Sequence, residues 1–212
     1  MKTSRSRLIR WLLAFGVGLP LVVATAQAQS TEQQPSAKVT AKTAAFTLIP
    51  FTIGTGDWVT ILSNDIKTAE MKDLFVTASL EAGVYTQTGV TGTGTSTAHA
   101  KLEVRALVDG SEIEPGPAAY ADRVQTLSTF MMFDEMIDLM MRTVNAASFS
   151  WVGIDIPVGV HNIAIQARVV TDGSATFGTF TAMGGVGKGT MTVESVRLIK
   201  EEDVIADPPL VP

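Results

Sequence analysis

The sequence contains no cysteine at any of its 212 positions. This absence excludes disulfides, thiolate metal sites, thiol nucleophiles and thiol redox chemistry. Aromatic residues make up only 7% of the chain, and the only histidines are His99 and His161. Because transition-metal sites need several nitrogen or sulfur donors, we expect no metal site and no cofactor. No motif marks a catalytic residue, and we expect that the protein is not an enzyme.

The chain also has few basic residues, 16 against 21 acidic ones, and four of the basic side chains lie in residues 2–10. An apolar stretch of about 14 residues follows, and then Ala26-Gln27-Ala28, the small-x-small pattern of a signal-peptidase site. We expect residues 1–28 to be a cleaved signal peptide, and the protein to be secreted or periplasmic. The apolar stretch is shorter than the roughly 20 residues that span a bilayer. No stable membrane anchor is therefore expected after cleavage.

Cleavage after Ala28 leaves 12 basic and 21 acidic residues, a net charge of −9. A strongly acidic protein repels the phosphate backbone and anionic lipid surfaces. Nucleic acid is therefore not an expected partner. A protein partner, a glycan and a second copy of the chain all stay open.

The remaining 184 residues are long enough for one domain with its own core. Residues 29–42 are polar and are expected to form a flexible lead. Residues 201–212 are charged and then proline-rich, and are expected to form a tail. The domain is therefore placed at residues 43–200.

Apolar and polar side chains alternate with period two in residues 74–81, 101–108 and 163–169. This pattern indicates half-buried antiparallel strands. Breaks rich in glycine, proline or aspartate separate these segments from further strand candidates, and they are expected at 54–57, 89–94, 109–110, 115–117, 157–159 and 172–173. Those candidates lie at 44–49, 58–63, 122–130, 148–156 and 189–199. We predict an all-β fold, an antiparallel two-sheet sandwich or jelly roll.

One segment departs from period two. Residues 129–144 hold five of the nine methionines. At 100° per residue, the charged side chains of residues 131–142 fall in one sector and the apolar ones opposite. Asp138 and Arg142 then have the i,i+4 spacing of a helical ion pair. We predict one short amphipathic helix over residues 131–142.

The apolar face of this helix has two interpretations. We favour the one in which it closes an end of the sandwich, with methionines filling an irregular surface. The other is a docking face for a partner, a second subunit or a lipid, because methionine surfaces suit adaptable binding. The candidate interaction face consists of Met132, Phe133, Met136, Ile137 and Met140.

Motifs for chemistry are weak. "GGVGKGT" at 184–190 resembles a phosphate-binding loop, but glycine rather than Ser or Thr follows Lys188, so we expect a flexible approach to the last strand. "DGSEIEPG" at 109–116 does not match a calcium loop and is expected to be a solvated turn. His161 shares the parity of apolar strand residues and is expected to be packed and hydrogen-bonded at a sheet end. His99 is expected to be solvated.

The expected role is non-catalytic binding or assembly, and two alternatives stay open. A carbohydrate-binding module would stack sugars on exposed rings. The available rings are Trp58, Phe75, Tyr85, Tyr120 and Trp151. A glycoside hydrolase would use two carboxylates placed by the fold. The candidate acids are Asp57, Glu81, Glu103 and Asp155.

Several segments resemble an uncharacterised family of exported bacterial proteins. They include "DWVTILSNDIKTAEMKDLFVTASLEAGVYTQT", "GVHNIAIQARV" and "VGKGTMTVESVRLI", and the resemblance covers nearly all of residues 57–200. It implies an exported β-sandwich without a known activity. Members similar to this chain often carry cysteines, which are absent here. No functional residue is therefore carried over.

Overall fold

The computed structural model describes residues 39–45, 47–49, 53–132 and 134–198, all in one compact unit. This part of the chain forms nine strands in one antiparallel sheet, and it contains no helix. The predicted all-β antiparallel fold is therefore confirmed. No helix in these ranges has the length and apolarity to cross a bilayer. The expected signal peptide and tail lie outside the described residues.

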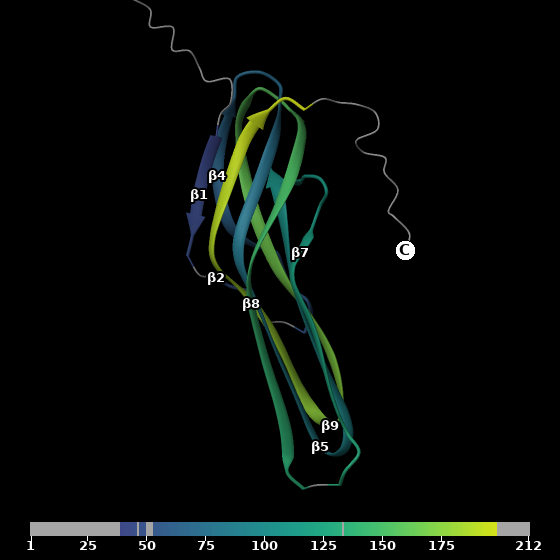
Figure 1. The fold of residues 1–212 in the computed structure, drawn as a ribbon. Helices are drawn as coiled ribbons and strands as arrows, with labels where there is room; N and C mark the ends of the chain where they lie inside the picture. Colours follow the sequence, from purple (N-terminus) through teal and green to yellow (C-terminus); the bar gives the residue numbers. More distant parts are fainter. Residues whose placement is uncertain (1–38, 46, 50–52, 133, 199–212) are drawn as a thin grey trace, which may run out of the picture. The chain divides into compact units, whose positions relative to one another are not determined.

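Two long strands organise the fold (Figure 1). β5 (Lys72–Val108) and β9 (Gly159–Val196) pair with each other along nearly their whole length. Their register shifts between Val90 and Thr95, where Gly92 has a φ of 65°. Phe177 of β9, across the ladder from this shift, has a φ of 52°. These are the points at which the paired strands fold back.

Contacts within β9 show this folding directly. A Cβ on Gly173 would lie 2.5 Å from the Phe180 ring. An extended strand would place two residues seven positions apart at about 23 Å. The β5–β9 ribbon therefore folds over on itself and forms two layers. The end that contains residues 91–94, 130–132, 134–135 and 176–178 is called the fold-back end.

Each layer contains one half of each long strand, with shorter strands beside them. The first layer has the order β8 (Met136–Ile156), first half of β5, second half of β9, β1 (Val39–Ala44), with β2 (Thr47–Leu48) also on β9. The second has the order β7 (Ala118–Thr129), second half of β5, first half of β9, β4 (Val59–Thr68). Two short strands, β3 (Gly54–Thr55) and β6 (Ser111–Glu112), pair with β9 and β5.

The core fills the space between the two layers at the end away from the fold-back. The apolar residues of the three alternating segments are buried there, as predicted. Trp151 is fully buried, and its indole N–H donates to the Gly116 carbonyl at 2.7 Å. The Tyr120 hydroxyl donates to the Ala78 carbonyl, also at 2.7 Å, and ties β7 to the other layer.

Toward the fold-back end the inner faces become polar. Gln125, Thr86 and Thr88 are buried there. The Gln125 side chain accepts from the Thr86 hydroxyl at 2.6 Å and donates to the Thr88 hydroxyl at 2.9 Å. It also donates to the Leu139 carbonyl at 2.6 Å. Hydrogen bonds between buried polar side chains therefore accompany apolar residues such as Val90 between the layers at this end.

The predicted helix over 131–142 is wrong. Residues 136–142 are the beginning of β8, and those described between 131 and 135 are not helical. The first half of β5 offers these residues a continuous ladder, which overrides local helix preference. Asp138 and Arg142 then lie about 13 Å apart along the strand, too far for the expected ion pair. Phe133 lies outside the described residues.

Some boundaries also differ from the expectation. Strand β1 begins at Val39, inside the segment expected to be a flexible lead. The glycine-rich residues 184–190 belong to β9 and are not a flexible approach to it. Asp172 and Gly173, which were expected to break a strand, also lie within β9.

Candidate functional site

Exposed apolar side chains gather around the connection from β7 to β8 at the fold-back end. Met132 is 93% exposed and Met140 is 65% exposed. They are too exposed to close the sandwich, so the favoured interpretation of this segment as a buried plug is wrong. We call the set the Met-rich surface: Phe130, Met131, Met132, Met136, Ile137, Leu139, Met140 and Met141.

The Met-rich surface uses both faces of β8. Ile137, Leu139 and Met141 lie opposite Val90, Thr88 and Thr86 and share their inward face. The intervening residues Met136 and Met140 face outward. β8 is the outermost strand of its layer here and pairs only with β5 among the described strands, so even its inward side chains remain partly open to solvent.

The backbone of β8 has a free edge at this end. Nearer the core, the Val152 N–H donates to the Glu114 carbonyl at 2.8 Å, on the side away from β5. The register of β8 on β5 is unbroken from Gly153 to Met136. Because N–H and C=O groups alternate in direction along a strand, those of even-numbered residues face the free edge. In Met136–Val144 they have no partner strand in the described part of the chain.

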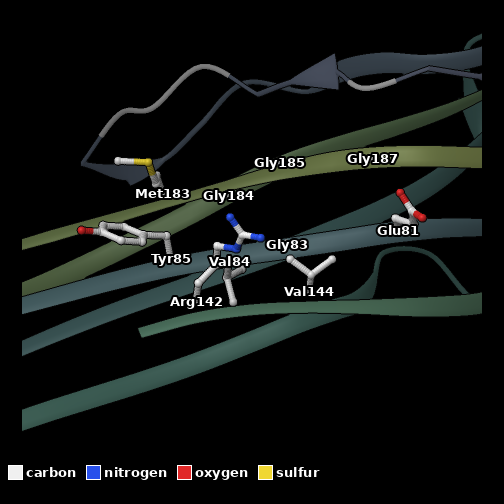
Figure 2. A pocket seen from close by; sticks show the side chains of 10 residues that line it. All are labelled: Glu81, Gly83, Val84, Tyr85, Arg142, Val144, Met183, Gly184, Gly185 and Gly187. Atoms are coloured by element: carbon white, nitrogen blue, oxygen red, sulfur yellow. The ribbon is translucent and has the colours of Figure 1, made fainter. Parts of the chain in front are cut away.

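The outer face of the first layer carries a depression of about 350 Å³ beside this edge (Figure 2). Its floor lacks large side chains because Val144 on β8, Gly83 on β5 and Gly185 on β9 lie side by side across three neighbouring strands. Figure 2 shows Tyr85 and Met183 at one end, Glu81 at the other, and Arg142 reaching over the floor. The Glu81 carboxylate accepts the Lys188 N–H at 3.0 Å. The depression therefore offers an apolar floor, one ring and charges of both signs.

The four candidate acids differ in their surroundings. Glu81 and Glu103 alternate with buried neighbours and lie on the outer faces of opposite layers. Burial raises the pKa of Glu103, but hydrogen bonds and charge from Lys101 and Arg168, at 2.6 and 2.8 Å, lower it overall. Asp57 is exposed in the segment before β4. Asp155 has a left-handed φ of 55°, and its N–H donates to Asp73.

Most of the candidate rings are buried or in contact with other side chains of the protein. Trp151 and Tyr120 are buried, and their rings are nearly parallel with centroids 6.4 Å apart. The Trp58 ring lies against the guanidinium groups of Arg105 and Arg168, at 4.3 and 4.4 Å. Phe75 is partly exposed on the outer face, and Tyr85 lines the depression.

His161 is packed at a sheet end as expected, with only 5% of its surface exposed. Nδ1 lies 2.7 Å from the Asp109 carboxylate and Nε2 lies 2.8 Å from the Pro157 carbonyl. Two acceptors favour the doubly protonated ring. The hydrogen bond to Asp109 accordingly raises the pKa of His161, and the same bond, with the Asn162 N–H, lowers the pKa of Asp109.

His99 is paired rather than simply solvated. Its Nε2 lies 2.8 Å from Asp122, and its Nδ1 lies 3.3 Å from Asp172. In "DGSEIEPG", Asp109 binds His161, while Glu112 pairs with Arg105 at 3.1 Å. Within the described ranges, no three His, Asp or Glu side chains are placed to hold a metal ion.

Sequence reasoning missed three features of this end of the molecule: the free edge of β8, the depression and the buried Gln125 network. The first had a signal in the sequence. Ile137, Leu139 and Met141 alternate with positions that include Asp138 and Arg142, which is a strand pattern. The other two depend on strands that come together only in the folded chain.

No family model matches this chain, and no curated protein matches it. Among solved structures, it is similar to the D431N mutant VP2 protein of infectious bursal disease virus in T=1 particles, with 14% identity and a TM-score of 0.29. That match covers 78% of this chain and 37% of the viral one. A VP2 subviral particle of the same virus matches with 16% identity and a TM-score of 0.27, over 77% and 38%. The chain therefore spans well under half of the length of these viral proteins, and the likeness is distant.

Proposed function

We propose that this protein is an exported, non-catalytic β-sandwich that binds or assembles through the Met-rich surface. The observation that carries the proposal is the exposure of these apolar side chains on both faces of one edge strand. Contiguous exposed apolar side chains mark interaction sites in soluble proteins. The export signal expected from residues 1–28 supports an extracellular or periplasmic partner.

The chemistry of the surface favours protein over lipid. Methionine side chains are unbranched and polarisable, so they adapt to the shape of a protein partner. Asp134, Glu135 and Asp138 border them and would be repelled by an anionic membrane. A protein surface that offers apolar groups and a few basic ones fits this arrangement best.

Site-specific photo-crosslinking in the producing cell tests the proposal. A photoreactive amino acid replaces Met132 or Met141, and in the matched control it replaces Val158, which is exposed in the connection from β8 to β9. We expect discrete covalent adducts, with this chain or with another protein, from the first two positions and none from the third. Failure of both surface positions to form adducts would contradict the proposal, as would equal adducts from Val158.

Carbohydrate binding is a second candidate, favoured by the depression beside β8. Tyr85 supplies a ring, and Arg142 and Glu81 supply polar groups around an apolar floor. A Cβ on Gly83 would meet its neighbours at 3.6 Å or more, so Gly83→Ala fills the floor without a clash. If this candidate is correct, glycan-array binding disappears in both Gly83→Ala and Tyr85→Ala. Absence of glycan binding by the unaltered protein rejects it.

A further inference from the structure

We propose that the free edge of β8 pairs with the same edge of a second copy, antiparallel and centred on Met140. This inference rests on the proposed function and names the partner of the Met-rich surface. It gives a two-fold symmetric contact in which each strand completes the sheet of the other. Three properties of β8 carry it: its backbone direction, its charges and its apolar side chains.

The backbone of β8 is open where the pairing requires it. In Met136–Val144, the N–H and C=O groups of even-numbered residues point away from β5 toward the free edge. A two-fold centred on Met140 places even residues opposite even residues, so these groups meet each other. The Gln125 side chain caps the carbonyl of Leu139, an odd residue that faces β5, and leaves the free edge uncovered.

The charges select this register. Centring on Met140 places Asp138 of each copy directly opposite Arg142 of the other, which gives two symmetric ion pairs. Neither side chain forms an ion pair with another described residue of its own chain. Shifting the centre by one residue places Asp138 opposite Met140 or Val144 and removes both pairs. Directly opposed unlike charges stabilise an antiparallel pair.

The apolar side chains match in the same register. On the outward face, Met140 meets its own copy and Met136 meets Val144. On the inward face, Leu139 meets Met141. All of these side chains are at least 40% exposed in the single chain, so they become buried only on pairing. Arg142, which lies over the depression in the single chain, adopts another rotamer to reach Asp138.

An unpaired edge strand often carries charges that prevent association. Asp138 and Arg142 could serve that purpose alone, in which case reversing either charge would not create a specific partner. Paired charges behave differently, because a reversal at one position can be complemented at the other. The two roles are therefore separable by charge reversal.

The experiment measures the molecular mass and dissociation constant of the purified protein by analytical ultracentrifugation. We expect a dimer for the unaltered protein. Asp138→Arg and Arg142→Asp each oppose two like-charge pairs, and each should raise the dissociation constant about 10- to 100-fold. The double variant Asp138→Arg/Arg142→Asp should restore it. Asp134→Arg changes net charge equally but precedes β8, so it should leave the dimer nearly unchanged.

Mixing supplies the decisive result. Asp138→Arg has two arginines and Arg142→Asp has two aspartates at the paired positions. At a concentration at which each variant alone is monomeric, an equimolar mixture should therefore form heterodimers. A mixture that stays monomeric, or a double variant that does not recover, overturns the register. A monomeric unaltered protein at every soluble concentration overturns the inference. Crosslinks from Met132 to a different protein would then leave the proposed function intact.

Discussion

Gln125 is the residue whose replacement best tests the description of the fold-back end. Its side chain is buried and makes three hydrogen bonds across the inner face, with the Thr86 hydroxyl, the Thr88 hydroxyl and the Leu139 carbonyl. Gln125→Leu keeps a similar volume but removes all three bonds. The polar groups that lose their partner are enclosed between the layers and cannot bond to water instead. Their loss therefore costs more free energy of unfolding than the loss of an exposed hydrogen bond would.

The expected cost follows from these bonds. A neutral intramolecular hydrogen bond contributes about 1 kcal/mol net. The Leu139 carbonyl faces β5 and keeps its ladder position opposite Thr88, so its loss is the smallest of the three. We therefore expect Gln125→Leu to lower the free energy of unfolding by about 2–3 kcal/mol, mainly through the two threonine hydroxyls.

Urea denaturation followed by tryptophan fluorescence measures this change. A triple variant, Gln125→Leu with Thr86→Val and Thr88→Val, removes the stranded hydroxyls together with their partner and should recover at least half of the loss. A single variant within about 0.5 kcal/mol of the unaltered protein would refute the network as a stabilising feature. A triple variant less stable than the single one would refute the assignment of the cost to unpaired hydroxyls.

Three further predictions concern other parts of the sandwich. Trp151→Ala should lower the free energy of unfolding by about 3–5 kcal/mol, because the ring is fully buried, and no loss in a melt would contradict its core position. Asp109→Asn keeps a residue type suited to the left-handed backbone there but removes the carboxylate beside His161. The raised pKa of His161 contributes stability that is complete below about pH 6.5 and is lost as pH rises through that raised pKa. The lowered pKa of Asp109 contributes stability above about pH 4 that is lost as pH falls. The unfolding free-energy difference between the unaltered protein and Asp109→Asn should therefore be largest between about pH 4 and 6.5 and should shrink toward pH 9, and growth toward pH 9 would contradict the pair. Met136→Asp, compared with the unaltered protein at a concentration at which both are monomeric, should change the melting temperature little, because its side chain covers no core, and a large drop would contradict its exposure.

Strand parity was the most predictable property of this chain. In 74–80, 102–108 and 163–169, each residue assigned to the inner face from period two is buried. The reason is physical: a strand with one polar face can satisfy burial in only one orientation. The break predicted over 89–94 also matches a real feature, the fold in β5 beside Gly92.

The bend in β9 could not be predicted in the same way. The sequence offered Asp172-Gly173 as the break, yet the chain bends at Phe177, a bulky residue with a φ of 52°. Large side chains rarely adopt that backbone conformation, so no local rule selects this position. Gly173 instead stays in the strand and admits the Phe180 ring, a role that depends on a contact across the fold.

The prediction of a helix over residues 131–142 failed for a related reason. The charged residues in this range fit a helical sector, but Asp138 and Arg142 also share parity in a strand, so both patterns were present. The choice between them depended on β5, which lies about fifty residues earlier and offers its edge. A helix of three turns cannot compete with a ladder that continues from residue 156 to residue 136.

The folded ribbon of β5 and β9 also has a consequence for how the chain reaches its native state. Asp73 pairs with Val196, and most of the sheet joins partners that are far apart in sequence. Such topologies fold slowly, because long loops must close before their contacts repay the lost entropy. The first half of β5 lies between β8 and the second half of β9, so it gains its second neighbour only when β9 has been synthesised. The first layer therefore cannot be completed until the synthesis of β9 is nearly finished.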